Sequence, residues 1–200
     1  MDRDRLTAAT DGVLAVIITI MVLELRPPPG VDLTALQSLG PHFLSYVLSF
    51  IYVGIYWNNH HHFFHLVKRV DGPILWANLH LLFWLSLVPF TTAWMGEHPT
   101  APAPAALYGL SLLCSALAWY VMQTTIVASQ GPQSPLRRAL GQDLKGKLSP
   151  IVYVAGVGLA FVNTLLADLI YLGVALIWLV PDRRIESHLR RQGVISEESD

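Results

Sequence analysis

The sequence predicts an all-α membrane protein with six transmembrane helices, and three observations support that fold class. Only 14% of the 200 residues are charged while 53% are hydrophobic, whereas soluble domains carry about 25% charged residues. Three long stretches, residues 33–67, 72–96 and 98–136, contain no Asp, Glu, Lys or Arg. The basic residues gather in short segments between such stretches, as they do at the inner ends of transmembrane helices.

The six expected helices follow these apolar stretches in order. The first contains about the 20 mostly apolar residues that a bilayer crossing requires. Pro27, Pro28 and Pro29 end it, because proline lacks a backbone N–H and fixes φ. The expected ranges are residues 6–26, 41–67, 73–95, 103–129, 148–163 and 168–181.

Turn-forming residues set the later boundaries. Asp71-Gly72-Pro73 separates the second expected helix from the third. Prolines make residues 98–104 an irregular connection, and prolines and glycines make residues 131–146 a linker before the fifth helix. Asp168 is expected to cap the sixth helix.

The positive charges orient these helices in the membrane. With the N-terminus in the cytoplasm, every Lys and Arg except Arg26 falls on the inner side. An odd number of helices would break this pattern, so we expect both termini in the cytoplasm. Residues 1–184 then form one transmembrane domain, and residues 185–200 form a cytoplasmic tail. The expected setting is a cell membrane, with the chain crossing it several times among the lipids.

Two carboxylates interrupt the first apolar helix, Asp11 near its start and Glu24 near its end. A charge at membrane depth is costly and usually marks an ion path or a buried polar network. Asp11 either caps a helix that starts at Gly12, or is buried and paired with Arg5 or with histidines of the second helix. Glu24 is either an interfacial charge beside Arg26 or part of a ring that attracts cations.

A stripe of side chains along the same helix is the candidate functional face. Val16, Ile20 and Leu23 follow i, i+4, i+7 spacing, and Thr19 lies beside them. Such a stripe faces lipid, packs on neighbouring helices or lines a pore, and the residues alone leave these three interpretations open. The Thr19 hydroxyl also has a local alternative, a hydrogen bond back to the carbonyl of residue 15.

The second expected helix ends in a dense polar and aromatic cluster, residues 57–65 (WNNHHHFFH). His61 and His65 lie four residues apart on one helical face, a spacing that can hold a metal. A histidine-dependent membrane enzyme or metal transporter using His60, His61, His62 and His65 is therefore the alternative function. The other histidines are scattered singly, so we expect packing and hydrogen bonding here rather than a bound metal.

The first helix resembles the signature of the transmembrane protein 175 family, the lysosomal-type potassium channels and their bacterial relatives. Thr10, Leu14 and Val16 are conservative replacements within this signature, whereas Ala9 replaces a phenylalanine. The cluster at residues 57–65 also resembles this family, but more weakly. The matching residues are Arg5, Asp11, Val13, Ala15, Thr19, Val22, Leu23 and Glu24.

This resemblance implies a homotetrameric channel whose first helix lines a central pore. Val16 would form the hydrophobic constriction and Thr19 a hydroxyl ring one turn outward, with Ile20 and Leu23 on the same face. Arg5, Thr10 and Asp11 would belong to a polar network behind the pore, which we expect His61 and His65 to join. The implied partners are further copies of the chain, membrane lipids and permeant potassium ions, with no other cofactor.

Other classes of function lack their motifs. The sequence contains no nucleotide-binding loop, nucleophile elbow or nucleic-acid motif, so neither an enzyme nor a nucleic-acid partner is expected. It also lacks the glycine-rich carbonyl filter of ordinary potassium channels. Selectivity would then come from side chains and pore width, and we expect only a modest preference for potassium over sodium.

Overall fold

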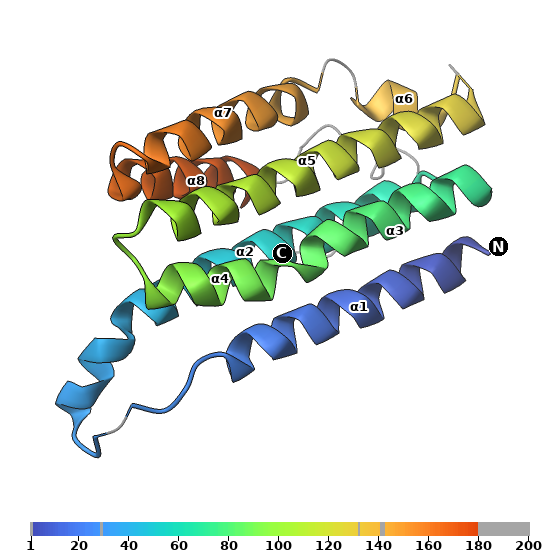
Figure 1. Ribbon diagram of the computed structural model, residues 1–200. Coiled ribbons are helices and arrows are strands. Elements are labelled where there is room, and N and C mark those ends of the chain that lie inside the picture. The colour runs from blue at the N-terminus through green and yellow to red at the C-terminus, as the bar shows by residue number, and fades with distance from the viewer. Residues whose placement is uncertain (1, 29, 132, 141–142, 180–200) are drawn as a thin grey trace, which may run out of the picture.

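The computed structural model describes residues 2–28, 30–131, 133–140 and 143–179. Within these ranges every regular element is a helix, and Figure 1 shows the long helices lying side by side in one bundle. The long helices are α1 (Arg3–Leu23), α2 (Gly40–His65), α3 (Gly72–Ser86), α4 (Val88–Glu97), α5 (Pro102–Gln130), α7 (Leu144–Ala160) and α8 (Thr164–Leu179). Two short elements complete the order, the 3-10 helix η1 (Leu33–Leu39) and α6 (Pro135–Leu140).

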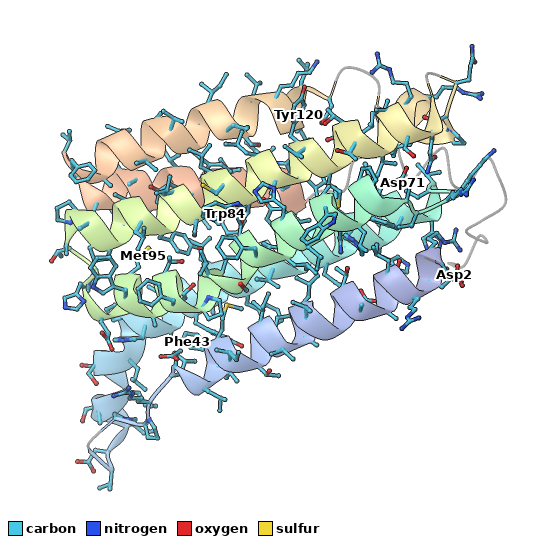
Figure 2. All side chains as sticks on the ribbon, turned by 45° about the vertical axis from the view of Figure 1, so that its right-hand side comes forward. Asp2, Phe43, Asp71, Trp84, Met95 and Tyr120 are labelled. Carbon is cyan, nitrogen blue, oxygen red and sulfur yellow. The ribbon has the colours of Figure 1, made fainter. Side chains whose placement is uncertain are left out.

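The bundle has α1 along one side and α7 with α8 along the opposite side (Figure 1). Between them, α5 packs against both α3 and α7, and α2 packs against α4. Figure 2 shows Asp2 and Asp71 at one end of the bundle and Phe43 and Met95 at the other. The start of α1 and the connection between α2 and α3 therefore lie on the same side.

Four helical stretches are long and apolar enough to cross a membrane, residues 3–23, 33–65, 72–97 and 102–130. The remaining long helices are shorter, with 17 residues in α7 and 16 in α8. A bilayer crossing needs about 20 apolar residues, so length alone supports four crossings. The expected all-helical, multi-pass architecture is confirmed at this level.

The third expected helix, residues 73–95, is broken in the structure. It consists of α3 and α4, with Leu87 between them. Pro89 has no N–H to donate, so the hydrogen-bond ladder of a continuous helix is interrupted one turn earlier. The Leu87 N–H instead reaches back only three residues, to the Trp84 carbonyl at 3.2 Å. The prediction of one continuous helix is wrong at this point.

The last helix begins earlier than the sequence suggested. Asn163 provides the cap, because its Oδ1 accepts a hydrogen bond from the Leu166 N–H at 3.2 Å. The expectation that Asp168 caps this helix is therefore wrong, and Asp168 lies in the second turn of α8. The expected cytoplasmic tail, residues 185–200, lies outside the described residues.

The buried side chains form two separate clusters. The first holds α1 against α2 and α3 through Leu14, Ile17, Phe64 and Leu81, each at most 3% exposed. The second joins α2, α5, α7 and α8 and is rich in tyrosine, with Tyr52, Tyr108, Tyr153 and Tyr171. Each cluster thus covers one half of the bundle, and α1 belongs to only one of them.

Candidate functional site

The two faces of α1 have opposite surroundings. Its buried residues recur at helical spacing and pack toward α2, α3 and α4. They are Leu6, Thr10, Leu14, Ile17 and Met21. The stripe singled out from the sequence lies on the other side, where Val16 is 55% exposed, Ile20 42% and Leu23 78%, with Thr19 also exposed. The chain therefore presents this stripe outward rather than to its own core.

An open groove borders the exposed face of α1. Val13, Val16 and Ile20 form its α1 wall, and Pro89 and Phe90 of α4 lie opposite. Its volume is about 590 Å³, and its lining is mostly apolar. The break between α3 and α4 thus falls beside the candidate face.

The Thr19 hydroxyl forms a hydrogen bond within its own helix, although not to the residue considered above. Its Oγ1 donates to the Val16 carbonyl oxygen at 2.8 Å. That bond uses the hydroxyl proton and leaves the oxygen lone pairs free, since a hydroxyl has one donor and two acceptor positions. A cation is bound by lone pairs, so the internal bond orients this oxygen without removing its capacity to contact an ion.

A buried polar chain connects α1, α3 and α2. The Asn78 amide donates from Nδ2 to the Thr10 Oγ1 at 2.9 Å, and its Oδ1 pairs with His60 Nε2 at 2.9 Å. The His60 ring stacks on Phe64 with centroids 4.2 Å apart. Thr10 is 1% exposed, His60 1% and Asn78 2%, so these bonds replace lost hydration and fix α1 to its neighbours.

Asp11 is bonded to tryptophan rather than to arginine or histidine. Its Oδ1 accepts a hydrogen bond from the Trp57 Nε1–H of α2 at 3.0 Å. The N-cap interpretation is wrong, because α1 begins at Arg3 and Asp11 lies in its third turn. Arg5 is exposed, and the described residues show no ion pair between its guanidinium and Asp11.

His61 and His65 pair with each other at the end of α2. Their Nε2 atoms are 3.1 Å apart and both side chains are exposed. Together with Asp4 and Asp11 they border an open groove of about 240 Å³ between α1 and α2. Within the described ranges no three His, Cys, Asp or Glu side chains are arranged to hold a metal, so the histidine-dependent alternative gains no support.

Sequence reasoning located the polar region but missed two of its members. His60, not His61 or His65, is the histidine that bonds toward Thr10. Helical spacing in the sequence indicates that His60 is buried, because it lies on the same helical face as buried Val53 and Phe64. Trp57 was also missed as the partner of Asp11, since the two residues are 46 positions apart and no local pattern joins them.

Known proteins are similar to this chain over most of its length. The family described as endosomal/lysosomal potassium channel TMEM175 matches residues 5–89. A potassium channel of Chryseobacterium sp. (strain P1-3) is 52% identical over 190 residues, covering 95% of this chain and 99% of that protein. A potassium channel of Streptomyces collinus is 34% identical over 175 residues, covering 81% of this chain and 84% of that protein.

A solved structure also matches the fold. It is the crystal structure of a lysosomal potassium-selective channel TMEM175 homolog from Chamaesiphon minutus. The TM-score is 0.79 at 27% identity, and the match covers 90% of this chain and 97% of that one. The similarity therefore extends along nearly the full length of both chains.

Proposed function

Because this chain belongs to the TMEM175 family, we propose that it conducts potassium ions passively across a cell membrane. It is a multi-pass membrane channel rather than an enzyme. Its relatives in Chryseobacterium and Streptomyces carry the name potassium channel, which makes a bacterial plasma membrane the natural location. The proposal rests above all on one observation, the exposed stripe of α1 that bears Val16 and Thr19.

We place the pore between subunits rather than inside one. A single chain packs both halves of its bundle with buried side chains and leaves α1 on one side (Figure 1). Four copies around a closed symmetry axis would bring four exposed α1 stripes together. The homotetramer, six crossings per subunit and cytoplasmic termini belong to this proposal, with α7 and α8 as the shorter crossings.

In this arrangement Val16 and Thr19 perform different tasks. Four Val16 side chains around the axis form an apolar constriction, which gates by excluding water. Thr19 lies one turn outward, and its lone pairs replace part of the hydration shell of a potassium ion. Ile20 and Leu23 continue the pore wall toward the outer side. Selectivity based on hydroxyls and width, without a carbonyl filter, gives a modest preference for potassium over sodium.

The polar residues behind the stripe hold α1 in position. Thr10 is anchored through Asn78 to His60, and Asp11 is anchored to Trp57. We propose that Arg5, His61 and His65, which are exposed in a single chain, complete this network in the assembled channel. Removing one member of a buried polar network leaves its partners unpaired, so the expected result is lost assembly rather than altered selectivity.

The deciding experiment compares ion fluxes into liposomes that contain the purified protein. Wild type should pass potassium faster than sodium, with caesium measured alongside. Val16→Asn should raise cation flux and weaken discrimination, because a polar ring lowers the barrier to wetting. Val154→Asn is the matched control, since Val154 on α7 has a similar exposure of 57%.

The flux results separate the channel from the site assignment. No potassium flux from well-assembled wild-type protein would refute the channel itself. Equal flux and selectivity in wild type and Val16→Asn would instead move the constriction to another face of the bundle.

A further inference from the structure

An open groove lies between α5, α6 and the start of α7. Its volume is about 310 Å³, which is within the range of about 300–1,000 Å³ for sites that bind small molecules. One face of α5 forms its floor, from Tyr120 through Thr124 to Val127. Figure 1 shows α6 toward the bundle end where α1 begins, which is the cytoplasmic side of the proposed topology. None of the lining residues belongs to the candidate pore face.

Two basic side chains border this groove without a partner of their own. Arg137 of α6 and Lys147 of α7 both line it, and both are exposed. Among the residues that the structure describes, no carboxylate pairs with either charge and no acceptor bonds to it. The neighbouring Arg138 differs, because it lies outside the groove and its guanidinium donates to the Gln133 carbonyl oxygen at 2.9 Å. The groove therefore has two cationic groups available to an anion.

Buried contacts fix the backbone on both sides of the groove. Leu136, next to Arg137, is fully buried in the cluster that also holds α1. At the start of α7, the Asp143 Oδ1 accepts the Gly146 N–H at 3.1 Å and its Oδ2 accepts the Gln123 Nε2–H of α5 at 2.9 Å. The Asp143 backbone has a left-handed φ of 39°, a costly conformation that persists only where surrounding contacts maintain it. The α6–α7 connection is thus held firmly on α5.

The charges in the lining match one phosphodiester. Asp143 also lines the groove, so two cations and one carboxylate leave a single net positive charge. A phosphodiester carries one negative charge, whereas a phosphate monoester carries nearly two at neutral pH. The Arg137 guanidinium can donate two parallel N–H bonds to phosphate oxygens, and the Lys147 ammonium adds a point charge. A singly charged phosphate group therefore suits this lining best.

The rest of the lining favours a lipid over a soluble anion. Val127 and Leu140 are apolar, and the Tyr120 ring is 45% exposed. The α5 stretch is among those long and apolar enough to cross a membrane, so acyl chains can lie along the same surface. Tyrosine rings are enriched at the membrane interface, and basic pockets between transmembrane helices on the cytoplasmic side bind lipid headgroups.

We propose that this groove binds one anionic phospholipid. Arg137 and Lys147 hold its phosphodiester, and its acyl chains lie along Tyr120 and Val127 of α5. Phosphatidylglycerol is the probe, because its headgroup carries one phosphodiester charge and an uncharged glycerol. The site goes beyond ion conduction, and it rests on the proposed function only for the membrane leaflet that it faces.

The test is native mass spectrometry of the full-length protein in detergent, which counts the lipids bound to each chain. Phosphatidylglycerol is compared with phosphatidylcholine of the same acyl chains, whose choline cancels the phosphate charge. The first phosphatidylglycerol should bind at least about tenfold more tightly. Arg137→Gln and Lys147→Gln should each weaken its binding about fivefold, as expected for one basic group beside an anionic lipid.

Arg138→Gln and Lys68→Gln are the matched controls, because each removes one exposed positive charge outside the groove. Both should leave phosphatidylglycerol binding unchanged. Absent phosphatidylglycerol binding, equal binding of the two lipids, wild-type affinity in both groove variants, or an equal loss in the controls would overturn the proposal. If one groove variant fails to fold, the other decides.

Glycerophosphoglycerol, the same headgroup without acyl chains, tests whether the ligand is a lipid. It should not displace phosphatidylglycerol at equal concentration. Displacement would overturn the lipid assignment and give the groove to a soluble phosphodiester instead. Binding is read from the mass of the complex, so the outcome does not depend on whether the chain conducts potassium.

Discussion

In the proposed pore, Thr19 is the residue through which potassium preference should be altered most directly. Thr19→Val keeps the side-chain shape but removes the hydroxyl oxygen, whose lone pairs are not used by its hydrogen bond to the Val16 carbonyl. The potassium-to-sodium flux ratio in liposomes should fall toward one, while total flux persists. Thr19→Ser should retain the preference. Thr125→Val is the matched control, because the Thr125 hydroxyl forms the same kind of internal bond in α5, to the Val121 carbonyl at 2.7 Å.

Asn78 should matter for stability rather than for ion preference. Asn78→Leu removes the amide that joins Thr10 to His60 and leaves both polar groups buried without their partner. The expected loss is about 1–3 kcal/mol for each unpaired group, seen as a lower thermal unfolding midpoint in detergent. Asn58→Leu, on α2 but outside this network, should change the midpoint little. Equal midpoints for the two variants would contradict the anchoring role of Asn78.

For single residues, the sequence identified the polar region but not which side chains form hydrogen bonds with each other there. The consecutive histidines His60, His61 and His62 point in different directions, because successive residues on a helix are rotated by about 100°. Which of them is buried depends on Phe64, Asn78 and Thr10, which come from α2, α3 and α1. Thr10 and Asp11 were recognised from the helix signature, whereas Trp57 required the packed structure.

Among the helices, α3 and α5 are tied together through Asp71 at the cytoplasmic side of the proposed topology. The Asp71 carboxylate caps α3 by accepting the Ile74 N–H at 3.0 Å, and it also accepts the Ser129 hydroxyl from the end of α5. These two donors hold the pKa of Asp71 below its ordinary value, with the Ser129 bond as the larger cause. The charged form is therefore favoured in the folded chain.

Asp71→Ala should lower stability by about 1 kcal/mol through the lost helix cap. The pKa of Asp71 is depressed in the folded chain. The Asp71 charge therefore stabilises the fold fully at a pH above the unfolded-state pKa, and this stabilisation is lost as the pH falls through the folded-state pKa. Wild type should consequently lose more stability than Asp71→Asn on acidification through that interval. Thermal unfolding followed against pH measures this difference, and parallel curves for the two proteins would refute it.

The existence of the helices followed from the sequence, but some ends did not. Uncharged stretches predicted α2 and α5 within a few residues, since an apolar run of that length has few other stable forms. The break at Leu87 was missed because a proline inside an apolar run is also compatible with a continuous membrane helix. Asn163 and Asp168 are both capping residue types, and only the hydrogen bond to Leu166 distinguishes them.

For the whole molecule, the proposed arrangement of four subunits around a central axis can be tested by cross-linking. Leu23 is 78% exposed on α1, and copies of it should meet near the four-fold axis, whereas Leu165 is 65% exposed on α8 at the opposite side of the subunit (Figure 1). In a Cys114→Ser background, Leu23→Cys should form disulfide-linked dimers under mild oxidation. Leu165→Cys should stay monomeric on the same gel. Equal cross-linking of both variants, or none in either, would contradict a central position for α1.

In the proposed tetrameric channel, the attachment of α1 along a single face has a mechanical consequence for opening and closing. Its packing partners belong to one buried cluster, and the tyrosine-rich cluster of α7 and α8 contains no α1 residue. Tilting or sliding α1 thus exchanges contacts in half of the bundle while the other half stays packed. Around a symmetry axis, four such helices can change the diameter of the passage while the outer helices serve as a rigid frame. The energy needed to open the passage is then set mainly by the α1 contacts and the Thr10–Asn78–His60 chain.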